Sequence, residues 1–304
     1  MEPRPLIIDC DPGKDDAVAL LLAFASPEFD VLAVTTVAGN VSLDRTQGNA
    51  RRICELAGRS HMAVHAGCPR PILKPLETAI RVHGEDGLAG AALPDPVMAL
   101  QPVHAVDFLV DRLMASDGGI TLAALGPLTN LALAIIKQPE IVPRIREIVL
   151  MGGALARGNV TPYAEFNMST DPHAAAVVFE AGAPLTMIGL DVTHQALATP
   201  ERSRAIGAIE RPAAATVSRM LALDLERREG GAPLHDPCVI AYLLRPDLFT
   251  GEAMNVTIET ANAERLGQTV ACAAGPGKPA NANVLKAIDA DGFFDLLTER
   301  LAVL

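Results

Sequence analysis

Four aspartates near the amino terminus constrain the fold of this chain more than any other feature. They fall within eight positions, directly after the apolar run Leu6-Ile7-Ile8, and are Asp9, Asp11, Asp15 and Asp16. The apolar run predicts a buried strand that ends at Pro12-Gly13, and the apolar residues after Asp15 have helical spacing. The carboxylates are therefore predicted to lie between the carboxyl end of a strand and the amino end of a helix, where open α/β sheets bind ligands.

The density of negative charge in this stretch points to a bound cation. Carboxylates this close together repel one another and have raised pKa values unless a cation holds them. Oxygen ligands favour Ca²⁺ or Mg²⁺ over a soft transition metal. A structural interpretation stays open, in which two aspartates complement the helix dipole and the other two cap the loop, each stabilising by up to about 1 kcal/mol.

The composition suits a sheet that is buried on both faces. Hydrophobic residues make up 50% of the 304 residues but aromatic residues only 3%. The core must then consist of Ala, Val, Leu and Ile, as in parallel strands covered by helices. We predict an α/β fold in which residues 1–304 form a single domain, a doubly wound and mostly parallel sheet with helices on both faces.

Charge and cysteine content exclude several classes of partner. The net charge of -11 and the pI near 5.1 argue against nucleic acid, because phosphate binding needs a basic face. No run approaches the roughly 18 consecutive apolar residues of a membrane span, so we expect no membrane partner. The five cysteines are scattered without CxxC spacing, which favours reduced thiols and a cytoplasmic location.

Polar residues follow strand after strand along the chain. Strands with polar residues beyond their ends are predicted at 31–37, 120–125, 145–151 and 185–190. Because parallel strands end at one edge of a sheet, distant segments are expected to build one site. The Pro- and Gly-rich segment 68–96 carries His83, a possible ligand contact, although a single His in a loop is more often a surface side chain. Later elements are predicted as helices at 200–209 and 213–229 and short strands at 256–259, 269–273 and 284–289.

Eight short motifs along the chain carry a resemblance to a known family. In order, they are Asp9–Ala17, Thr36–Asn40, Val82–Gly84, Leu125–Asn130, Leu150–Gly153, Ala164–Asn167, Gly189–His194 and His235–Pro237. Together they resemble the motifs of the inosine–uridine-preferring nucleoside hydrolase family, and the resemblance covers essentially the whole chain. One such match is weak evidence, whereas eight in order are specific.

The resemblance implies a Ca²⁺ ion and a set of residues around it. Its ligands would be Asp11, Asp16, Asp236 and the backbone carbonyl of Leu125, with water and the ribose 2′- and 3′-hydroxyls completing the shell. By the same resemblance, Asp11 would be the general base for the attacking water. Asp9 would support the metal loop from behind.

The resemblance also implies which residues bind the substrate, a ribonucleoside. Asp15 would accept a hydrogen bond from the 2′-hydroxyl, and the other sugar contacts would be Asn40, Asn167, Met151, Asn159 and Glu165. For three of these a structural role stays open: Asn40 as a turn residue, Met151 as core filler and Asn167 as a helix cap. His235 is the candidate proton donor to the leaving base, and His83 a second polar contact near it. The family's assemblies imply a homodimer or homotetramer.

One residue and one segment depart from the family's motifs. Lys14 occupies a fingerprint position that is usually apolar, and a cation there is expected to lower carboxylate pKa values or to compete weakly with the metal. Residues 223–234 contain no aromatic side chain, whereas purine-active relatives carry tyrosines next to the base. We therefore expect pyrimidine nucleosides to be at least as good substrates as inosine.

Two other functions stay open on the residues alone. An Asp-x-Asp at the end of a first strand also occurs in Mg²⁺-dependent aspartyl phosphotransferases, in which the first Asp is the nucleophile. That chemistry needs Lys and Ser or Thr on later loops, where this chain has Asn, Glu and Met. A non-catalytic nucleoside- or ribose-binding protein is the second alternative, and the intact Asp11 and Asp236 argue against it.

Overall fold

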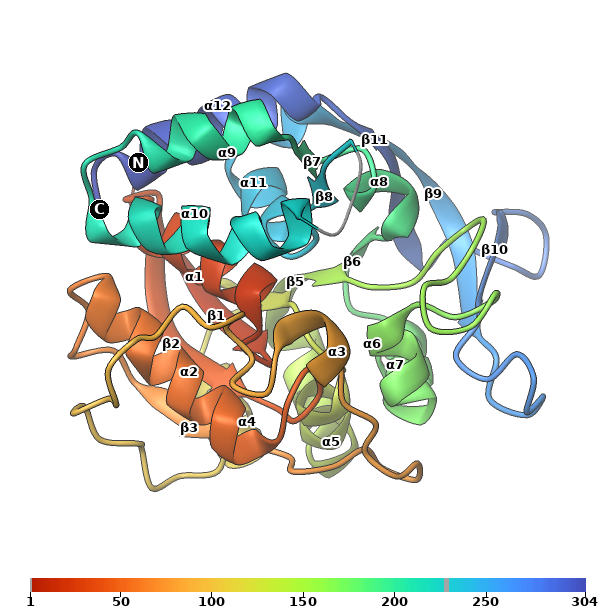
Figure 1. The fold of residues 1–304 in the computed structure, drawn as a ribbon. Coiled ribbons are helices and arrows are strands. Elements are labelled where there is room, and N and C mark those ends of the chain that lie inside the picture. The colour runs from red at the N-terminus through yellow and green to blue at the C-terminus, as the bar shows by residue number, and fades with distance from the viewer. Residues whose placement is uncertain (1, 227–229) are drawn as a thin grey trace.

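One large sheet organises the molecule. The computed structural model describes residues 2–226 and 230–304, and Figure 1 shows the sheet running through its centre. The strand order is β10-β9-β11-β6-β5-β4-β1-β2-β3. The strands are β1 Arg4–Cys10, β2 Phe29–Thr36, β3 Val64–Ala66, β4 Ile120–Ala124, β5 Ile145–Met151, β6 Leu185–Ile188, β9 Phe249–Ile258, β10 Thr269–Ala273 and β11 Ala282–Ile288.

The sheet is mostly parallel, as predicted. From β3 to β11 in this order, each strand pairs in parallel with the next, through β2, β1, β4, β5 and β6. Only β9 runs against its neighbours β11 and β10. A separate two-stranded sheet joins β7 Leu197–Ala198 to β8 Ala232–Pro233. The doubly wound α/β class is confirmed, whereas the extent of the single domain, 1–304, stays a prediction.

Helices cover both faces of this sheet (Figure 1), and β1 shows why the sequence allows it. Leu6 and Ile8 pack into one core and Ile7 into the other, because successive strand residues point to opposite faces. The first core includes residues of α1 Lys14–Phe24, α2 Leu43–Leu56, α9 Pro200–Gly207, α10 Pro212–Leu225, α11 Pro237–Leu244 and α12 Ala290–Leu301. The second includes residues of α4 Ala105–Met114, α5 Thr129–Lys137 and α7 Pro172–Glu180.

The remaining helical segments are short. They are α3 Ile80–His83, α6 Phe166–Thr170, α8 Leu190–Thr193 and the 3₁₀ turns Pro139–Arg144 and Pro246–Leu248. Within residues 2–226 and 230–304, no helix has both the length and the apolar character needed to cross a membrane.

Several predicted boundaries were wrong, and for two of them the physical reason is clear. The strand predicted at 185–190 ends at Ile188, because Leu190 N–H bonds to Gly153 O and starts α8. The strand predicted from residue 256 begins at Phe249, since pairing with β11 extends it through exposed residues that show no apolar pattern. The helix predicted at 213–229 is α10, Pro212–Leu225, and residues 227–229 lie outside the described residues.

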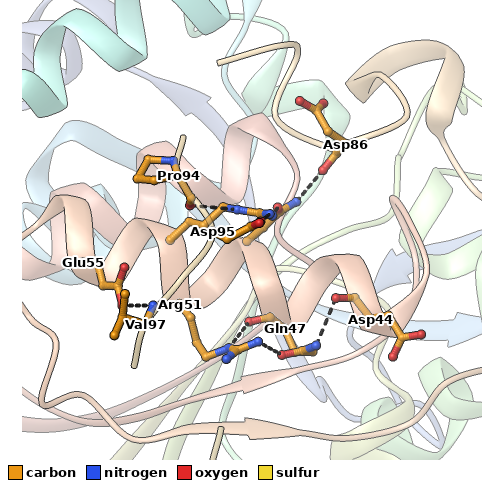
Figure 2. A network of polar contacts seen from close by, with 10 residues as sticks. Asp44, Gln47, Arg51, Glu55, Asp86, Pro94, Asp95 and Val97 are labelled. Carbon is orange, nitrogen blue, oxygen red and sulfur yellow. Dashed lines mark hydrogen bonds and ion pairs between the residues drawn. The ribbon is translucent and has the colours of Figure 1, made fainter. Parts of the chain in front are cut away.

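Side chains of α2 hold the irregular segment 84–98 in place. Figure 2 shows Glu55, whose Oε1 accepts from the N–H of Val97 at 2.7 Å. Arg52 donates from Nε to the carbonyl of Pro94 at 3.2 Å. Asn49 Nδ2 donates to two carbonyls, Pro12 O at 3.0 Å and Asp86 O at 2.7 Å. We call this set of contacts the α2 clasp, and its Asn49 joins the aspartate-rich loop directly to the loop that carries His83.

Candidate functional site

The aspartate-rich loop has the predicted placement, after β1 and at the start of α1. Asp16 closes the turn, since its Oδ1 accepts from Asp11 N–H at 3.1 Å and its Oδ2 from Gly13 N–H at 3.0 Å. Strand order reverses between β1 and β4, so this loop lies at a switch point of the doubly wound sheet. The fold therefore puts the carboxylates where such sheets bind ligands.

Loops from two neighbouring strands close tightly around Asp11. Its Oδ2 accepts from Asn40 N–H at 2.6 Å, and its Oδ1 is buried without a hydrogen-bond partner in the described structure. A Cβ added at Gly39, after β2, would collide with Oδ2, and one added at Gly126, after β4, would collide with Oδ1. Glycine is thus required at both positions to let the backbone approach the carboxylate.

Asp9 lies beneath this loop. Its Oδ1 accepts from Asn130 Nδ2 at 2.8 Å and from Thr35 Oγ1 at 2.5 Å. Burial raises the pKa of Asp9 to about 7, and these two bonds oppose the rise. Asn130 also donates to Thr36 O at 3.0 Å, so it connects β1, β2 and α5. The sequence motif contained Asn130, but its role in holding Asp9 could be found only from the fold.

The second group of site residues comes from the ends of β4 and β5 and from α6. Asn167 Nδ2 donates to Leu125 O at 2.8 Å and to Met151 O at 3.1 Å. Glu165 begins α6 and accepts from Asn167 N–H at 2.9 Å and from Gly153 N–H at 3.0 Å. Asn159 is exposed, and its Oδ1 accepts from Phe166 N–H at 2.9 Å.

His235 and Asp236 reach the loop from the start of α11. Asp15 Oδ2 lies 3.4 Å from the backbone N–H of His235, which donates to it. The ring of His235 is oriented by α8, because its Nδ1 lies 2.7 Å from Thr193 Oγ1. The negative charges of Asp16, Asp15 and Asp11 all act on the buried Asp236 carboxyl and raise its pKa. Thus segments more than 200 positions apart meet at the aspartate-rich loop.

His83 is buried and lines the cavity, so the alternative of a surface side chain was wrong, whereas its predicted contact with the base stays a prediction. The short helix α3 and the α2 clasp fix the loop, and the ring packs against Gly13, where an added Cβ would collide with it. Its Nδ1 accepts from Lys14 N–H at 3.3 Å. Burial, and then the charges of Lys14 and His235, lower the pKa of His83 to about 3. The ring is therefore neutral, with its proton on Nε2, ready to donate a hydrogen bond.

A cavity of about 950 Å³ connects these residues. All of the predicted site residues line it except Asp11 and Asp16, which lie buried beneath its floor. The sequence did not predict the rest of its lining, notably residues 77–82 of one wall, Lys14 and Asp224. The volume is that of a small-molecule site.

The carboxylates at the floor suit a hard cation. Burial raises the pKa values of Asp11, Asp16 and Asp236, and repulsion from Asp16 raises those of Asp11 and Asp236 further. A cation would relieve that repulsion, and the unpartnered Asp11 Oδ1 has the chemistry of a ligand for Ca²⁺ or Mg²⁺. Among the described residues, no three His, Cys, Asp or Glu side chains are grouped to hold a metal unaided. Carbonyl, water or substrate oxygens would have to complete the shell.

Comparison with known proteins decides the family. The model of the family described as "Inosine-uridine preferring nucleoside hydrolase" matches residues 6–295. The chain belongs to this family. It is an enzyme of the nucleoside hydrolase type, an N-glycosidase, and the resemblance read from the eight motifs is confirmed.

Two curated relatives and two solved structures illustrate the likeness. The relatives are both named pyrimidine-specific ribonucleoside hydrolase RihA. The one from Shewanella sp. (strain ANA-3) is 49% identical, over 99% of this chain and 96% of its own. The one from Photobacterium profundum is 46% identical, over 98% and 99%. A purine-preferring ribonucleoside hydrolase from Gardnerella vaginalis superimposes with a TM-score of 0.93, at 32% identity over 98% of both chains. A plant nucleoside hydrolase gives 0.92, at 32% identity over 99% of both.

Proposed function

We propose that this protein hydrolyses the N-glycosidic bond of pyrimidine ribonucleosides, with a Ca²⁺ ion at the aspartate-rich loop. The observation that carries the proposal is the buried carboxylate cluster at the floor of a cavity of about 950 Å³, whose walls bear amide and imidazole groups. The names of the curated relatives support the pyrimidine preference. The fold itself does not decide it, because a purine-preferring enzyme has nearly the same fold.

The metal would be held by Asp11, Asp16 and Asp236 together with the carbonyl of Leu125. Asn167 already donates to that carbonyl at 2.8 Å, which leaves the oxygen's second lone pair for a ligand. A bound Ca²⁺ would supply positive charge that orients a water and the ribose hydroxyls and makes that water more acidic.

The chain's own residues perform the hydrolysis. Asp11 takes a proton from the attacking water, and the oxygen of that water bonds to C1′ of the ribose. The C1′–N bond breaks with its electron pair leaving on the base, so the sugar becomes oxocarbenium-like. The carboxylate of Asp15 beside the ribose stabilises that positive charge. His235 donates a proton to the departing base, and neutral His83 donates a hydrogen bond from Nε2.

Surrounding groups prepare these residues for their roles. Asn40 N–H fixes Oδ2 of Asp11 at 2.6 Å, and in the described structure no hydrogen bond occupies Oδ1. At the start of α6 the backbone N–H of Asn167 donates to the carboxylate of Glu165. This bond fixes the two proposed sugar contacts relative to each other. Preorganised groups of this kind need little rearrangement in the transition state.

The test is a ribose-release assay on uridine, cytidine, inosine and p-nitrophenyl riboside, with and without EDTA, combined with elemental analysis. We expect about one Ca²⁺ per chain, loss of activity with EDTA, and kcat/KM for the pyrimidine nucleosides at least equal to that for inosine. If elemental analysis finds zinc, or finds that active protein contains no Ca²⁺, the assignment of Ca²⁺ is wrong. A strong preference for inosine would contradict the base assignment.

Two further properties belong to the same proposal. We propose a cytoplasmic location, supported by four buried, unpaired cysteines, Cys10, Cys54, Cys68 and Cys238. We also propose that the enzyme is a homodimer or homotetramer, since most soluble oligomers are closed and symmetric.

A further inference from the structure

One ion pair in the cavity has no place in the proposed mechanism. Lys14 Nζ, at the start of α1, pairs with Asp224 Oδ2 on α10 and also donates to Val82 O at 3.2 Å. Both charged residues line the cavity, yet they are only 4% and 9% exposed. A buried ion pair seldom stabilises a fold better than packed apolar side chains would. Fold stability alone therefore does not account for this pair on a cavity wall.

The pair lies beside His83, the proposed polar contact of the base. The backbone N–H of Lys14 donates to His83 Nδ1 at 3.3 Å, and Lys14 directly precedes Asp15 at the start of α1. Lys14, Asp15, His83 and Asp224 all line the same cavity. Asp15 is the proposed contact of the ribose 2′-hydroxyl, and His83 a proposed contact of the base. The ion pair therefore adjoins residues that are proposed to contact the base and the ribose.

Each partner keeps hydrogen-bonding capacity. An ammonium group has three N–H donors, and Lys14 uses two of them, on Asp224 and Val82. Within residues 2–226 and 230–304, no group donates to the second oxygen of Asp224, Oδ1. A donor and an acceptor side by side match the edge of a pyrimidine ring, which presents a carbonyl or amine at C4 next to N3.

We infer that the Lys14–Asp224 pair reads the N3/C4 edge of the pyrimidine base and is the specificity determinant of this enzyme. With uracil, Asp224 Oδ1 accepts from N3–H and Lys14 donates to O4. With cytosine the roles change: Lys14 donates to N3 and Asp224 accepts from the C4 amine. In a purine the corresponding edge lies one ring farther from the ribose, so the pair would meet the ring instead of its edge. This inference rests on the proposed function.

The first test needs no variant. We expect kcat/KM of the wild-type enzyme to fall about 10- to 100-fold from uridine to 3-methyluridine, because the methyl group removes N3–H and leaves Asp224 Oδ1 without a donor. The matched substrate is 5-methyluridine, which carries the same group on another edge and should lose less than about threefold by this reasoning. Equal rates on uridine and 3-methyluridine would overturn the inference.

The second test compares the same two substrates on a variant enzyme that lacks the ion pair. The double variant Lys14→Met/Asp224→Ala removes both charges together, so it leaves no unpaired buried charge. We expect its uridine to 3-methyluridine ratio to fall to within about threefold of unity, mainly through a raised KM for uridine. A merely structural pair would lower both rates and keep the ratio, which would overturn the inference.

The control is Asp107→Asn, which breaks the exposed Lys137–Asp107 pair, neither residue of which lines the cavity, and which should keep the wild-type ratio. Failure of the proposed function is recognised separately. In that case the wild-type enzyme hydrolyses no riboside, p-nitrophenyl riboside included. If it hydrolyses p-nitrophenyl riboside and uridine but ignores N3 methylation, only the inference about the pair fails.

Discussion

At the scale of single residues, the site depends on groups held by partners that are distant in sequence. Asp11 is fixed by Asn40, and Asp9 by Asn130, 121 positions away. The sequence predicted that these aspartates lie at a strand end, because a short apolar run followed by Pro-Gly has few other structures. It could not predict which amides would bind them, since that depends on loops brought together by the sheet.

Asp11→Asn should reduce kcat by about 10²- to 10⁴-fold, because an amide cannot take the proton from water. The substitution is nearly isosteric, so the Asn40 contact can persist and the protein should stay folded. Steady-state kinetics, circular dichroism and Ca²⁺ content must be measured together, since Asp11 is also a proposed metal ligand. A variant with normal Ca²⁺ and near-normal kcat would move the base to another residue.

His235→Ala separates a proton donor from a positioning residue. If His235 protonates the leaving base, the variant should lose kcat severely on uridine and much less on p-nitrophenyl riboside, whose leaving group is stable without a proton. The exposed His61 offers a control, and His61→Ala should match the wild type on both substrates. Equal losses of His235→Ala on both substrates would show instead that the residue supports Asp236.

At the scale of elements, the strands were predicted better than the loops. β4 is buried along its whole length and β5 ends in the apolar run of residues 148–151, so local composition marks both strands. The burial of His83 could not be predicted, because it depends on α3 and on the α2 clasp, whose contacts join positions about 40 residues apart. The Lys14–Asp224 pair joins residues 210 positions apart and left no local pattern either.

Asn49→Ala tests the α2 clasp. The variant leaves the carbonyls of Pro12 and Asp86 without their shared donor, which should lower the free energy of unfolding by about 1–3 kcal/mol. It should also raise KM, because the loop that carries His83 loses its tie to the aspartate-rich loop. Denaturant unfolding and steady-state kinetics measure the two effects.

The control for this experiment lies on the same helix. Arg45 is exposed, and Arg45→Ala should change the free energy of unfolding by less than about 0.5 kcal/mol. If Asn49→Ala lowers stability but leaves KM unchanged, the clasp supports the fold without positioning the site.

At the scale of the whole molecule, the sheet explains why one site is built from so many segments. The switch point between β1 and β4 puts the loops after β1, β2, β4 and β5 around the carboxylates, and α11 closes the ring with Asp236. The parallel class followed from composition. The antiparallel β9 and β10 did not, since their exposed residues lack a periodic apolar pattern.

Light scattering at micromolar concentration tests the assembly. With 31.9 kDa per chain, a homodimer or homotetramer should have two or four times that mass. A species of a single chain's mass throughout the concentration range would contradict the predicted assembly. The measurement should be repeated with EDTA, because it shows whether the proposed ion also supports association.

The glycines pressed against Asp11 determine where this enzyme can change during evolution. At Gly39 and Gly126 even one methyl group would strike the carboxylate, so substitution is blocked directly around Asp11. Residues 77–82 and α10 on the other walls carry no such restriction from glycine packing. Variation there can alter the accepted base while the bond-breaking groups stay fixed. A library meant to redirect this enzyme to new nucleosides should therefore randomise those walls and leave the floor untouched.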